Sequence, residues 1–362
     1  MASDRIVVTR AAPGGDADHE RATNAAVARM LAELQVCDFA GEYDPAARYG
    51  GRLYFVPSDT LLAGEARALR IRDEDDLFGG VVPFPFVATK AIVHPLGDRG
   101  ARTPPGWSQA FAQRVKSATL PGFAAFAVED ARRAALRLLR LGSIRLKPGQ
   151  GVGGRGQHVV ADAAGLDAAL LRIDQEALPR FGLSIELNLA DATTYSIGQV
   201  RVAGMLASYC GTQRTITDSR GRAAFGGSDL LVVRGGFDAL AVLALAAEAR
   251  ECIGQARAFD AAAGEYPGFF ASRRNYDAVR GRDRDGRARS GVLEQSWRIG
   301  GASGPEIAAL AALRADPQLH AARARSSEIY GSEDPPPGAI LQFRGVDRRL
   351  GPMTKYTIVE PA

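Results

Sequence analysis

A glycine-rich turn that follows an apolar strand is the feature that most constrains this fold. Residues 143–162 read SIRLKPGQGVGGRGQHVVAD, and Lys147 ends the apolar run. Glycine lets successive backbone N–H groups turn toward one anion without Cβ clashes, and a lysine beside the turn adds a point charge. We therefore predict a phosphate-binding loop whose ligand is a nucleoside triphosphate. Its glycines are Gly151, Gly153, Gly154 and Gly156.

The residues after the loop separate three kinds of glycine-rich site. The spacing G-x-G-x-x-G is present, but in a dinucleotide-binding fold it opens a helix that holds the pyrophosphate. Here QHVV predicts a second strand, and the next helix begins only near Leu166. A P-loop requires lysine and serine or threonine after its last glycine, where Gln157 and His158 stand instead. The loop is thus expected to cap a β-hairpin, and a glycine hairpin without a ligand is the alternative.

Two carboxylates are predicted to meet on a second hairpin. The segments NYDAV and GVLEQSWR read as antiparallel strands around a polar Arg/Asp/Gly turn. Glu294, Ser296 and Arg298 share one face of the later strand, because side chains alternate with a period of two. Asp277 can join Glu294 from the earlier strand around a hard cation. Magnesium is commonly bound by one or two carboxylates plus substrate phosphates, and the arginine fork suits a phosphate.

The order of these segments resembles the ATP-grasp superfamily, over residues 90–310. Between the loop and the carboxylates, residues 182–189 and 193–202 read as two consecutive strands of one sheet. The phrases FGGVVPFPFVATKAIVHPL, GGSDLLVVRGG, ASRRNYD and LEQSWRIGGAS look like a bacterial branch of the superfamily with no established activity. The resemblance implies a nucleotide, ATP, held with Mg²⁺ between two α+β subdomains.

The resemblance also implies roles for individual residues. Lys147 corresponds to the lysine of the loop and Lys90 to the first nucleotide lysine. On the same basis, Glu186 corresponds to the glutamate at the adenine, with Leu189 lining the base. The implied metal ligands are Asp277, Glu294 and Ser296, with Arg298 as the arginine after them.

Two positions depart from the superfamily pattern. The usual metal-binding asparagine is Ser296, whose hydroxyl can still bind a magnesium-bound water. The usual ribose-side glutamate is Thr194, and Asp191 is the candidate to serve the ribose instead.

The implied activity is ATP-dependent ligation of a small-molecule carboxylate to an amine, or to a thiol, through an acylphosphate. Arg298 and Lys147 are the expected catalytic residues. A small-molecule kinase, or a nucleotide-binding protein without turnover, is the alternative. Polar residues on glycine-punctuated strands are candidates for the acceptor site: Tyr209, Gln213, Arg214, Ser228 and Asp229.

Composition excludes several other classes. The chain has 362 residues, 46% of them hydrophobic, and a formal charge of +4. That charge is too small and dispersed to argue for nucleic acid. The cysteines show no C-x-x-C spacing, and the histidines form no zinc set. No apolar run is long enough to span a bilayer and no signal peptide opens the chain, so we expect a cytoplasmic protein, with a homodimer suggested by the superfamily.

The expected fold class is α/β and α+β, with an ATP-grasp body behind a short α/β N-terminal domain. Alternating strand and helix patterns predict four parts. They are an N-terminal α/β domain over 1–85, a subdomain with the glycine-rich flap over 86–180, a subdomain with the adenine and metal sites over 181–330, and a C-terminal hairpin over 331–362. A long helix is expected over residues 237–263.

Overall fold

The structure is a computed structural model that describes residues 4–12, 17–150, 156–221, 223–331 and 333–361. The chain starts with a small parallel sheet in the order β2-β1-β3. Its elements are β1 (Arg5–Arg10), α1 (Asp18–Gln35), β2 (Asp38–Glu42) and β3 (Arg52–Pro57). Helix α1 buries Val27, Leu31 and Leu34, a helical spacing that gives it one apolar face. These elements form a small α/β unit at the start of the chain.

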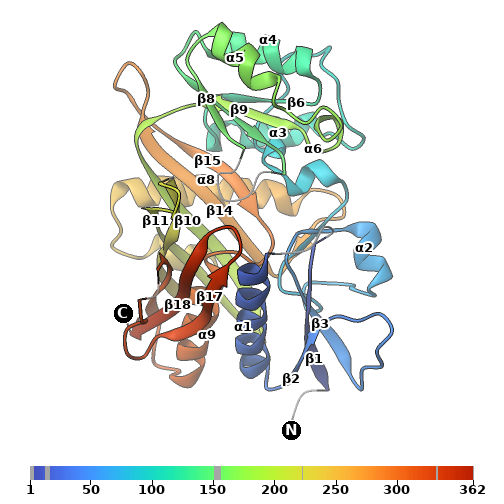
Figure 1. Ribbon diagram of the computed structural model, residues 1–362, viewed down its shortest axis with the longest axis vertical. Helices are drawn as coiled ribbons and strands as arrows, with labels where there is room; N and C mark the ends of the chain where they lie inside the picture. The colour runs from blue at the N-terminus through green and yellow to red at the C-terminus, as the bar shows by residue number, and fades with distance from the viewer. Residues whose placement is uncertain (1–3, 13–16, 151–155, 222, 332, 362) are drawn as a thin grey trace.

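A connecting region follows, between this N-terminal sheet and the four-stranded sheet described next (Figure 1). A short sheet in the order β13-β5-β4 ties residues near 61 and 81 to residues near 270. The elements are β4 (Leu61–Leu62), α2 (Ala63–Ala68), β5 (Gly80–Val82), η1 (Pro85–Ala88), η2 (Lys90–Val93), α3 (Gln109–Val115), η3 (Lys116–Ala118) and β13 (Phe270–Ala271).

A four-stranded sheet carries the glycine-rich hairpin. Its order is β6-β9-β7-β8, and β7 pairs with β8 as predicted, with Leu146 opposite His158. Helix α4 covers the sheet through alanines and a leucine at positions 131, 134, 135 and 138, so its apolar stripe faces β6 and β9. The elements are β6 (Gly122–Ala125), α4 (Val128–Leu138), β7 (Ile144–Pro148), β8 (His158–Val160), α5 (Ala163–Leu170), α6 (Leu178–Phe181) and β9 (Leu183–Leu187).

The body of the molecule is an eight-stranded sheet in the order β15-β14-β10-β11-β12-β16-β18-β17. All of its neighbouring strands are antiparallel. The strands are β10 (Ala190–Val202), β11 (Met205–Thr217), β12 (Ala223–Arg234), β14 (Arg273–Arg282), β15 (Ala288–Ser296), β16 (Ala321–Tyr330), β17 (Ile340–Asp347) and β18 (Gly351–Pro361). The expected C-terminal hairpin is β17–β18, and β16 links it to the body.

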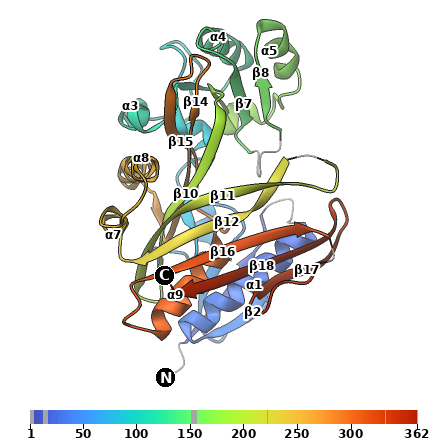
Figure 2. The same ribbon diagram turned by 90° about the vertical axis from the view of Figure 1, so that its left-hand side faces the viewer.

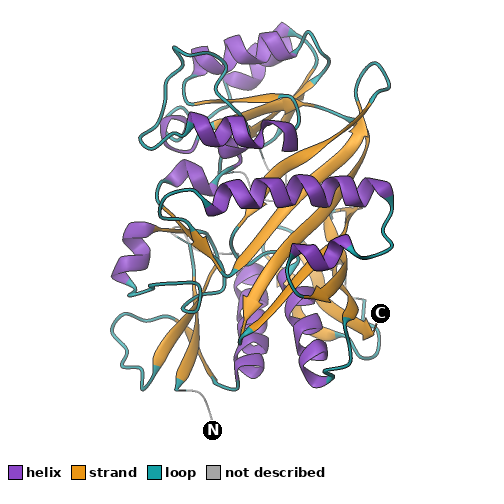
Figure 3. Cartoon of the chain, turned by 180° about the vertical axis from the view of Figure 1, so that it is seen from behind, coloured by secondary structure: helices purple, strands orange, loops and turns teal. Residues whose placement is uncertain are grey.

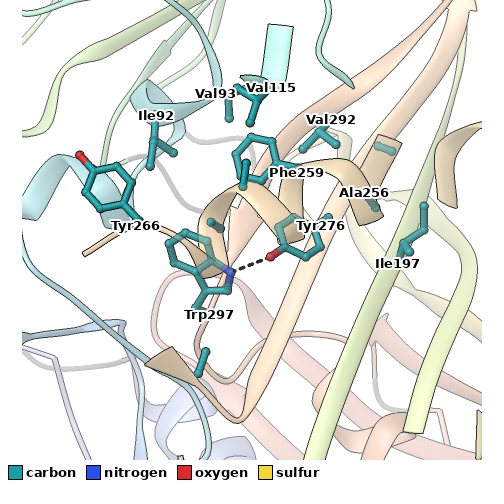
Figure 4. Packing of buried hydrophobic residues seen from close by; sticks show 14 of the residues in the cluster. Ile92, Val93, Val115, Ile197, Ala256, Phe259, Tyr266, Tyr276, Val292 and Trp297 are labelled. Carbon is teal, nitrogen blue, oxygen red and sulfur yellow. Dashed lines mark hydrogen bonds between the residues drawn. The ribbon is translucent and has the colours of Figure 1, made fainter. Parts of the chain in front are cut away.

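Helices cover both faces of the large sheet (Figures 1 and 3). Helix α8 (Ala247–Gly264) crosses one face, and α9 (Ser303–Ala315) lies with α1 on the other. Under α8, Trp297 is 1% exposed and donates from Nε1 to the Tyr276 hydroxyl, 3.2 Å away (Figure 4). This packing places Trp297 in the core and fixes the end of β15.

Two sequence-based expectations about this region are wrong. Residues 183–187 and 193–202 do not share a sheet, because β9 pairs with β6 and β7 while β10 pairs with β11 and β14. The expected long helix is broken into α7 (Phe237–Ala241) and α8, because Ala246 adopts an extended backbone with ψ 150°. Among the described residues, no helix is both long and apolar enough to cross a membrane.

Candidate nucleotide and metal site

Lys147 at the end of β7 belongs to a buried cluster of charges. Its Nζ lies 2.5 Å from Oε1 of Glu186, in the neighbouring strand β9. The other carboxylate oxygen, Oε2, is 3.2 Å from Nε2 of His94. All three side chains are at most 3% exposed. Burial pushes the pKa of Glu186 upward, but the charges and hydrogen bonds of Lys147 and His94 outweigh it and hold that pKa below its ordinary value.

Asp277 and Glu294 face each other across the hairpin, as predicted. They are cross-strand partners in β14 and β15. Oδ1 of Asp277 accepts hydrogen bonds from Ser196 Oγ at 3.1 Å and Asn275 Nδ2 at 2.9 Å. Burial and the like charge of Glu294 nevertheless raise the pKa of Asp277 above its ordinary value. The pair therefore concentrates negative charge, which Lys90 offsets in part.

Lys90 connects the region before the four-stranded sheet to this carboxylate pair. It stands at the start of η2 and forms an ion pair with Oε2 of Glu294. From the other side, Lys147 Nζ lies 3.4 Å from the main-chain oxygen of Leu293. Leu293 has no partner in β14, because the register shifts by one residue between Asp277 and Ala278. Both predicted nucleotide lysines thus converge on the strand that carries Glu294, where β14 and β15 reach the four-stranded sheet (Figures 1 and 2).

Gln295 holds β15 in place from the face of the strand opposite to Glu294. Its Nε2 donates to the main-chain oxygens of Val87 and Thr89, each at 2.9 Å, and so attaches β15 to the turn before Lys90. The sequence carried a signal for Gln295, since it is a polar residue in the row of Leu293 and Trp297, where apolar side chains are expected.

A second layer of buried polar groups supports the carboxylates. Arg273 is 1% exposed and holds Glu306 of α9 through two contacts, Nε–Oε2 at 2.8 Å and Nη2–Oε1 at 2.6 Å. Its Nη1 also donates to the main-chain oxygen of Ser296, 3.2 Å away. Tyr209 donates to Asn275 Oδ1 at 2.9 Å, and Asn275 in turn donates to Asp277. Arg273 and Tyr209 are therefore buried supports, so neither presents a free polar group to a substrate.

The remaining predicted residues lie around this centre. Ser296 is half-buried opposite Asn275. Arg298 donates from Nη1 to the main-chain oxygen of Ile299 at 2.9 Å, and its Nε is 3.9 Å from Asp59 Oδ1.

Of the residues predicted for the adenine and the ribose, Leu189 is half-buried. Asp191 is exposed at the start of β10, with φ +49°. Gly156 turns with φ +73° at the end of the glycine loop. Gly151, Gly153 and Gly154 lie outside the described residues.

His94 is the residue of this centre that sequence reasoning missed. It is 0% exposed within the apolar run AIVHPL, and its partner Glu186 is far away in the sequence. No spacing rule links the two. Gly122 leaves room for the imidazole, because a Cβ there would lie 2.6 Å from His94 Cε1.

The oxygen ligands around Asp277 are compatible with a magnesium ion. No group of three or more His, Cys, Asp or Glu side chains suited to a metal occurs in the described part of the chain. The Asp277–Glu294 pair, with a hydroxyl at Ser296, still fits this ion, which takes few carboxylates when phosphate oxygens complete its shell.

The three cysteines are free thiols, and burial raises the pKa of Cys210 and of Cys252 to about 12.

Comparison with solved structures finds similar folds. Phosphoribosylamine–glycine ligase of Thermotoga maritima matches with a TM-score of 0.51 and 13% identity, over 99% of this chain and 92% of that one. D-alanyl-alanine synthetase A of Vibrio cholerae matches at 0.49 and 12% identity, over 82% and 89%. D-cycloserine synthetase DcsG matches at 0.45 and 10% identity, over 82% and 92%. The expected ATP-grasp fold is confirmed.

Sequence comparison identifies the family of this chain. No curated protein matches the sequence. One family model matches residues 7–357, nearly the whole chain. The chain therefore belongs to the family described as "Protein of unknown function (DUF3182)".

Proposed function

We propose that this protein is an ATP-dependent ligase that joins a small-molecule carboxylate to an amine, or to a thiol, through an acylphosphate. One observation carries the proposal. Two lysines, Lys90 and Lys147, converge on the strand that pairs Glu294 with Asp277. Phosphoryl transfer needs positioning and charge neutralisation more than a protein nucleophile, and this set of groups provides both. Phosphoribosylamine–glycine ligase, which has a similar fold, is a ligase by name.

Each charged group has a place in this reaction. Asp277 and Glu294 would hold magnesium, which neutralises the phosphate oxygens when bound. Lys90 and Lys147 would bind the phosphates, and Arg298 would hold the transferred phosphoryl group by its planar fork.

The chemistry proceeds in two displacements. A substrate carboxylate oxygen forms a bond to the γ-phosphorus while the bond to ADP breaks, giving ADP and an acylphosphate. The amine or thiol then attacks the acyl carbon, inorganic phosphate leaves, and the attacking group loses its proton to solvent.

Calorimetry of ATP binding tests the site directly. We expect wild-type protein to bind ATP more tightly with Mg²⁺ than without it. Asp277→Asn should remove the magnesium effect, because Asn keeps an oxygen for Ser196 and Asn275 but lacks the charge. Absence of ATP binding under both conditions would refute the proposal.

Product analysis tests the reaction class. With ATP, Mg²⁺ and pairs of small carboxylates and amines, a ligase releases ADP and inorganic phosphate together. ADP release without free phosphate would identify a kinase instead. ATP binding with no ADP release across the panel would support a nucleotide-binding protein without turnover.

A further inference from the structure

Lys147 is held by one carboxylate, Glu186, and that carboxylate is held in turn by His94. Nζ of Lys147 lies 2.5 Å from Oε1 of Glu186, and Oε2 of Glu186 lies 3.2 Å from Nε2 of His94. A carboxylate only accepts hydrogen bonds, so Nε2 carries the hydrogen in this contact. The three side chains therefore form a line, with the lysine at one end and the histidine at the other.

The position of the Lys147 ammonium depends on its partner. A lysine carries a compact charge on a flexible four-carbon stem, so packing alone does not fix Nζ. Ser184 stands directly opposite Lys147 in β9, and its hydroxyl forms no hydrogen bond within the described part of the protein. Lys147 instead contacts Glu186, which lies two residues further along β9. Glu186 therefore determines where this charge lies.

His94 fixes the orientation of the Glu186 carboxylate. One hydrogen-bonded oxygen leaves a carboxylate free to turn, because the last torsion of a glutamate is broad. The contact between Oε2 and His94 supplies the second restraint. Removal of this donor would leave a buried oxygen without its hydrogen bond, and rotation of the carboxylate would then displace Nζ of Lys147.

The surrounding chain holds the imidazole of His94 in place. His94 directly follows η2 and precedes a proline, and its extended backbone, with φ −122° and ψ 153°, is the conformation that a residue before proline favours. The main-chain oxygen of Pro95 then accepts from the N–H of Ala124 at 2.8 Å, which attaches this segment to β6. In the same strand, Gly122 stands opposite Glu186 and leaves room for the ring.

Stability alone does not explain a histidine at this position. The side chain is 0% exposed, and its Nδ1 has no hydrogen-bond partner among the described residues. A buried nitrogen without a partner costs free energy, and an apolar side chain in the run AIVHPL would avoid that cost. Residues that lower stability in this way are expected where they serve a functional site.

We propose that His94 is a positioning residue for the nucleotide, which acts through Glu186 to hold the Lys147 ammonium where a phosphate of ATP binds. The proposal rests on the proposed function, which assigns phosphate binding to Lys147. Because η2 begins with Lys90, one short segment, residues 90–94, places both nucleotide lysines. It carries Lys90 itself, and it orients Lys147 through His94 and Glu186.

Two amides at position 94 test the donor while the side chain stays polar. In His94→Gln, the amide nitrogen reaches the place of the histidine Nε2, whereas His94→Asn is one methylene shorter and falls short of Glu186. The matched controls are His19→Gln and His19→Asn. His19 is another buried histidine, and it contacts a carboxylate, Asp347, away from the candidate site.

Two measurements follow the nucleotide and Lys147 separately. Calorimetry gives the affinity for ATP with Mg²⁺, and pulse acetylation with peptide mass spectrometry gives the reactivity of the Lys147 amine without nucleotide. We expect His94→Asn to weaken ATP binding by about tenfold and to raise the acetylation rate of Lys147 severalfold. His94→Gln should stay close to wild type, and both His19 variants should leave both readings unchanged. The melting temperature of each variant shows that it is folded.

Unchanged ATP affinity in His94→Asn, in a protein that binds ATP, would overturn the proposal. So would an equal loss in the two amides, or a loss without a change at Lys147, because His94 would then act by another route. A protein that binds no ATP, with Lys147 equally reactive in every variant, would refute both this proposal and the proposed function. A Lys147 amine that reacts faster in His94→Asn, in a protein that binds no ATP, would keep the positioning of Lys147 and remove the proposed ligase.

Discussion

The four-stranded sheet and the end of the large sheet treat a buried carboxylate in opposite ways. Glu186, in the four-stranded sheet, is paired on both oxygens by Lys147 and His94. Asp277, in the large sheet, faces another carboxylate, and its pKa is raised rather than lowered. In the first setting the charges compensate one another, so the pairing contributes to the fold beside the phosphate-binding role proposed for Lys147. The second sets two carboxylates against one lysine, Lys90, so a net negative charge remains, as expected of a site that binds a cation.

The strongest test of this difference is removal of the charge that compensates Glu186. Lys147→Met leaves a buried carboxylate with only His94 beside it, so we expect the free energy of unfolding to fall by about 3–5 kcal/mol. Urea titration measures this loss. The double variant Lys147→Met/Glu186→Gln should recover most of it, and a double variant as unstable as the single one would contradict the compensated state of Glu186.

This expectation also limits how Lys147 can be used to test turnover. A loss of ATP consumption in Lys147→Met could follow from a weakened fold alone. Asp277 is the cleaner position, because burial and the like charge of Glu294 raise its pKa, so a neutral side chain there is expected to cost the fold less.

A third carboxylate, which lies outside the candidate site, extends this comparison. Asp347, at the end of β17, lies 2.8 Å from His19 Nδ1 of α1. Burial raises its pKa, but the bonds from His19 and from the backbone of Arg349 and Leu350 lower it overall, from 3.8 to about 2. A depressed pKa stabilises the folded state above the unfolded value, so this stability should be lost as the pH falls from about 4 to about 2.

Asp347→Asn should therefore lower the free energy of unfolding by about 2 kcal/mol at pH 7. The difference from wild type should shrink as the pH falls through about 4 and be lost below about 2. Urea unfolding at pH 7, 4 and 2.5 measures both effects. A difference that stays constant over this range would show that the charge of Asp347 is not the stabilising feature.

Asp277→Asn is expected to have the smallest effect on stability and to act with the opposite sign. A raised pKa means that ionisation of Asp277 opposes folding, so its contribution is most favourable at low pH and is lost as the pH rises through the folded pKa. At pH 7 the variant should be as stable as wild type or more stable, by up to about 1 kcal/mol. Its magnesium-dependent ATP affinity should fall by about tenfold or more. Strong destabilisation at pH 7 would place Asp277 with Glu186 as a structural carboxylate.

Local patterns predicted the parts of the site that lie close together in the sequence. The glycine-rich hairpin, the facing strands of Asp277 and Glu294 and the buried Trp297 follow from alternation, turn chemistry and hydrophobicity. These features need only neighbouring residues to form. The ATP-grasp fold came from the order of such segments.

Pairings between distant segments were not predictable in the same way. The strand at 183–187 alternates apolar residues with Ser184 and Glu186, and nothing in this pattern indicates whether it joins the glycine-rich hairpin or the following strand. The strand at 321–330 carries arginines and serines that suggest a surface loop, yet it links the C-terminal hairpin to the sheet. The break, at residues 242–246, lies in a run of alanine and leucine with one valine, where neither glycine nor proline signals the end of a helix.

The unpaired Leu293 determines on which face of β15 Glu294 and the residues after it lie. Counted from the turn, where Arg282 pairs with Ala288, an uninterrupted ladder would place Leu293 opposite Asp277. Glu294 would then stand beside Tyr276 on the opposite face, against the core beneath α8. The same residues can therefore produce a paired carboxylate site or a misplaced buried charge. Deletion of one residue would keep the composition of this strand almost intact and still erase its chemistry, so the site depends on a length as much as on the identity of its side chains.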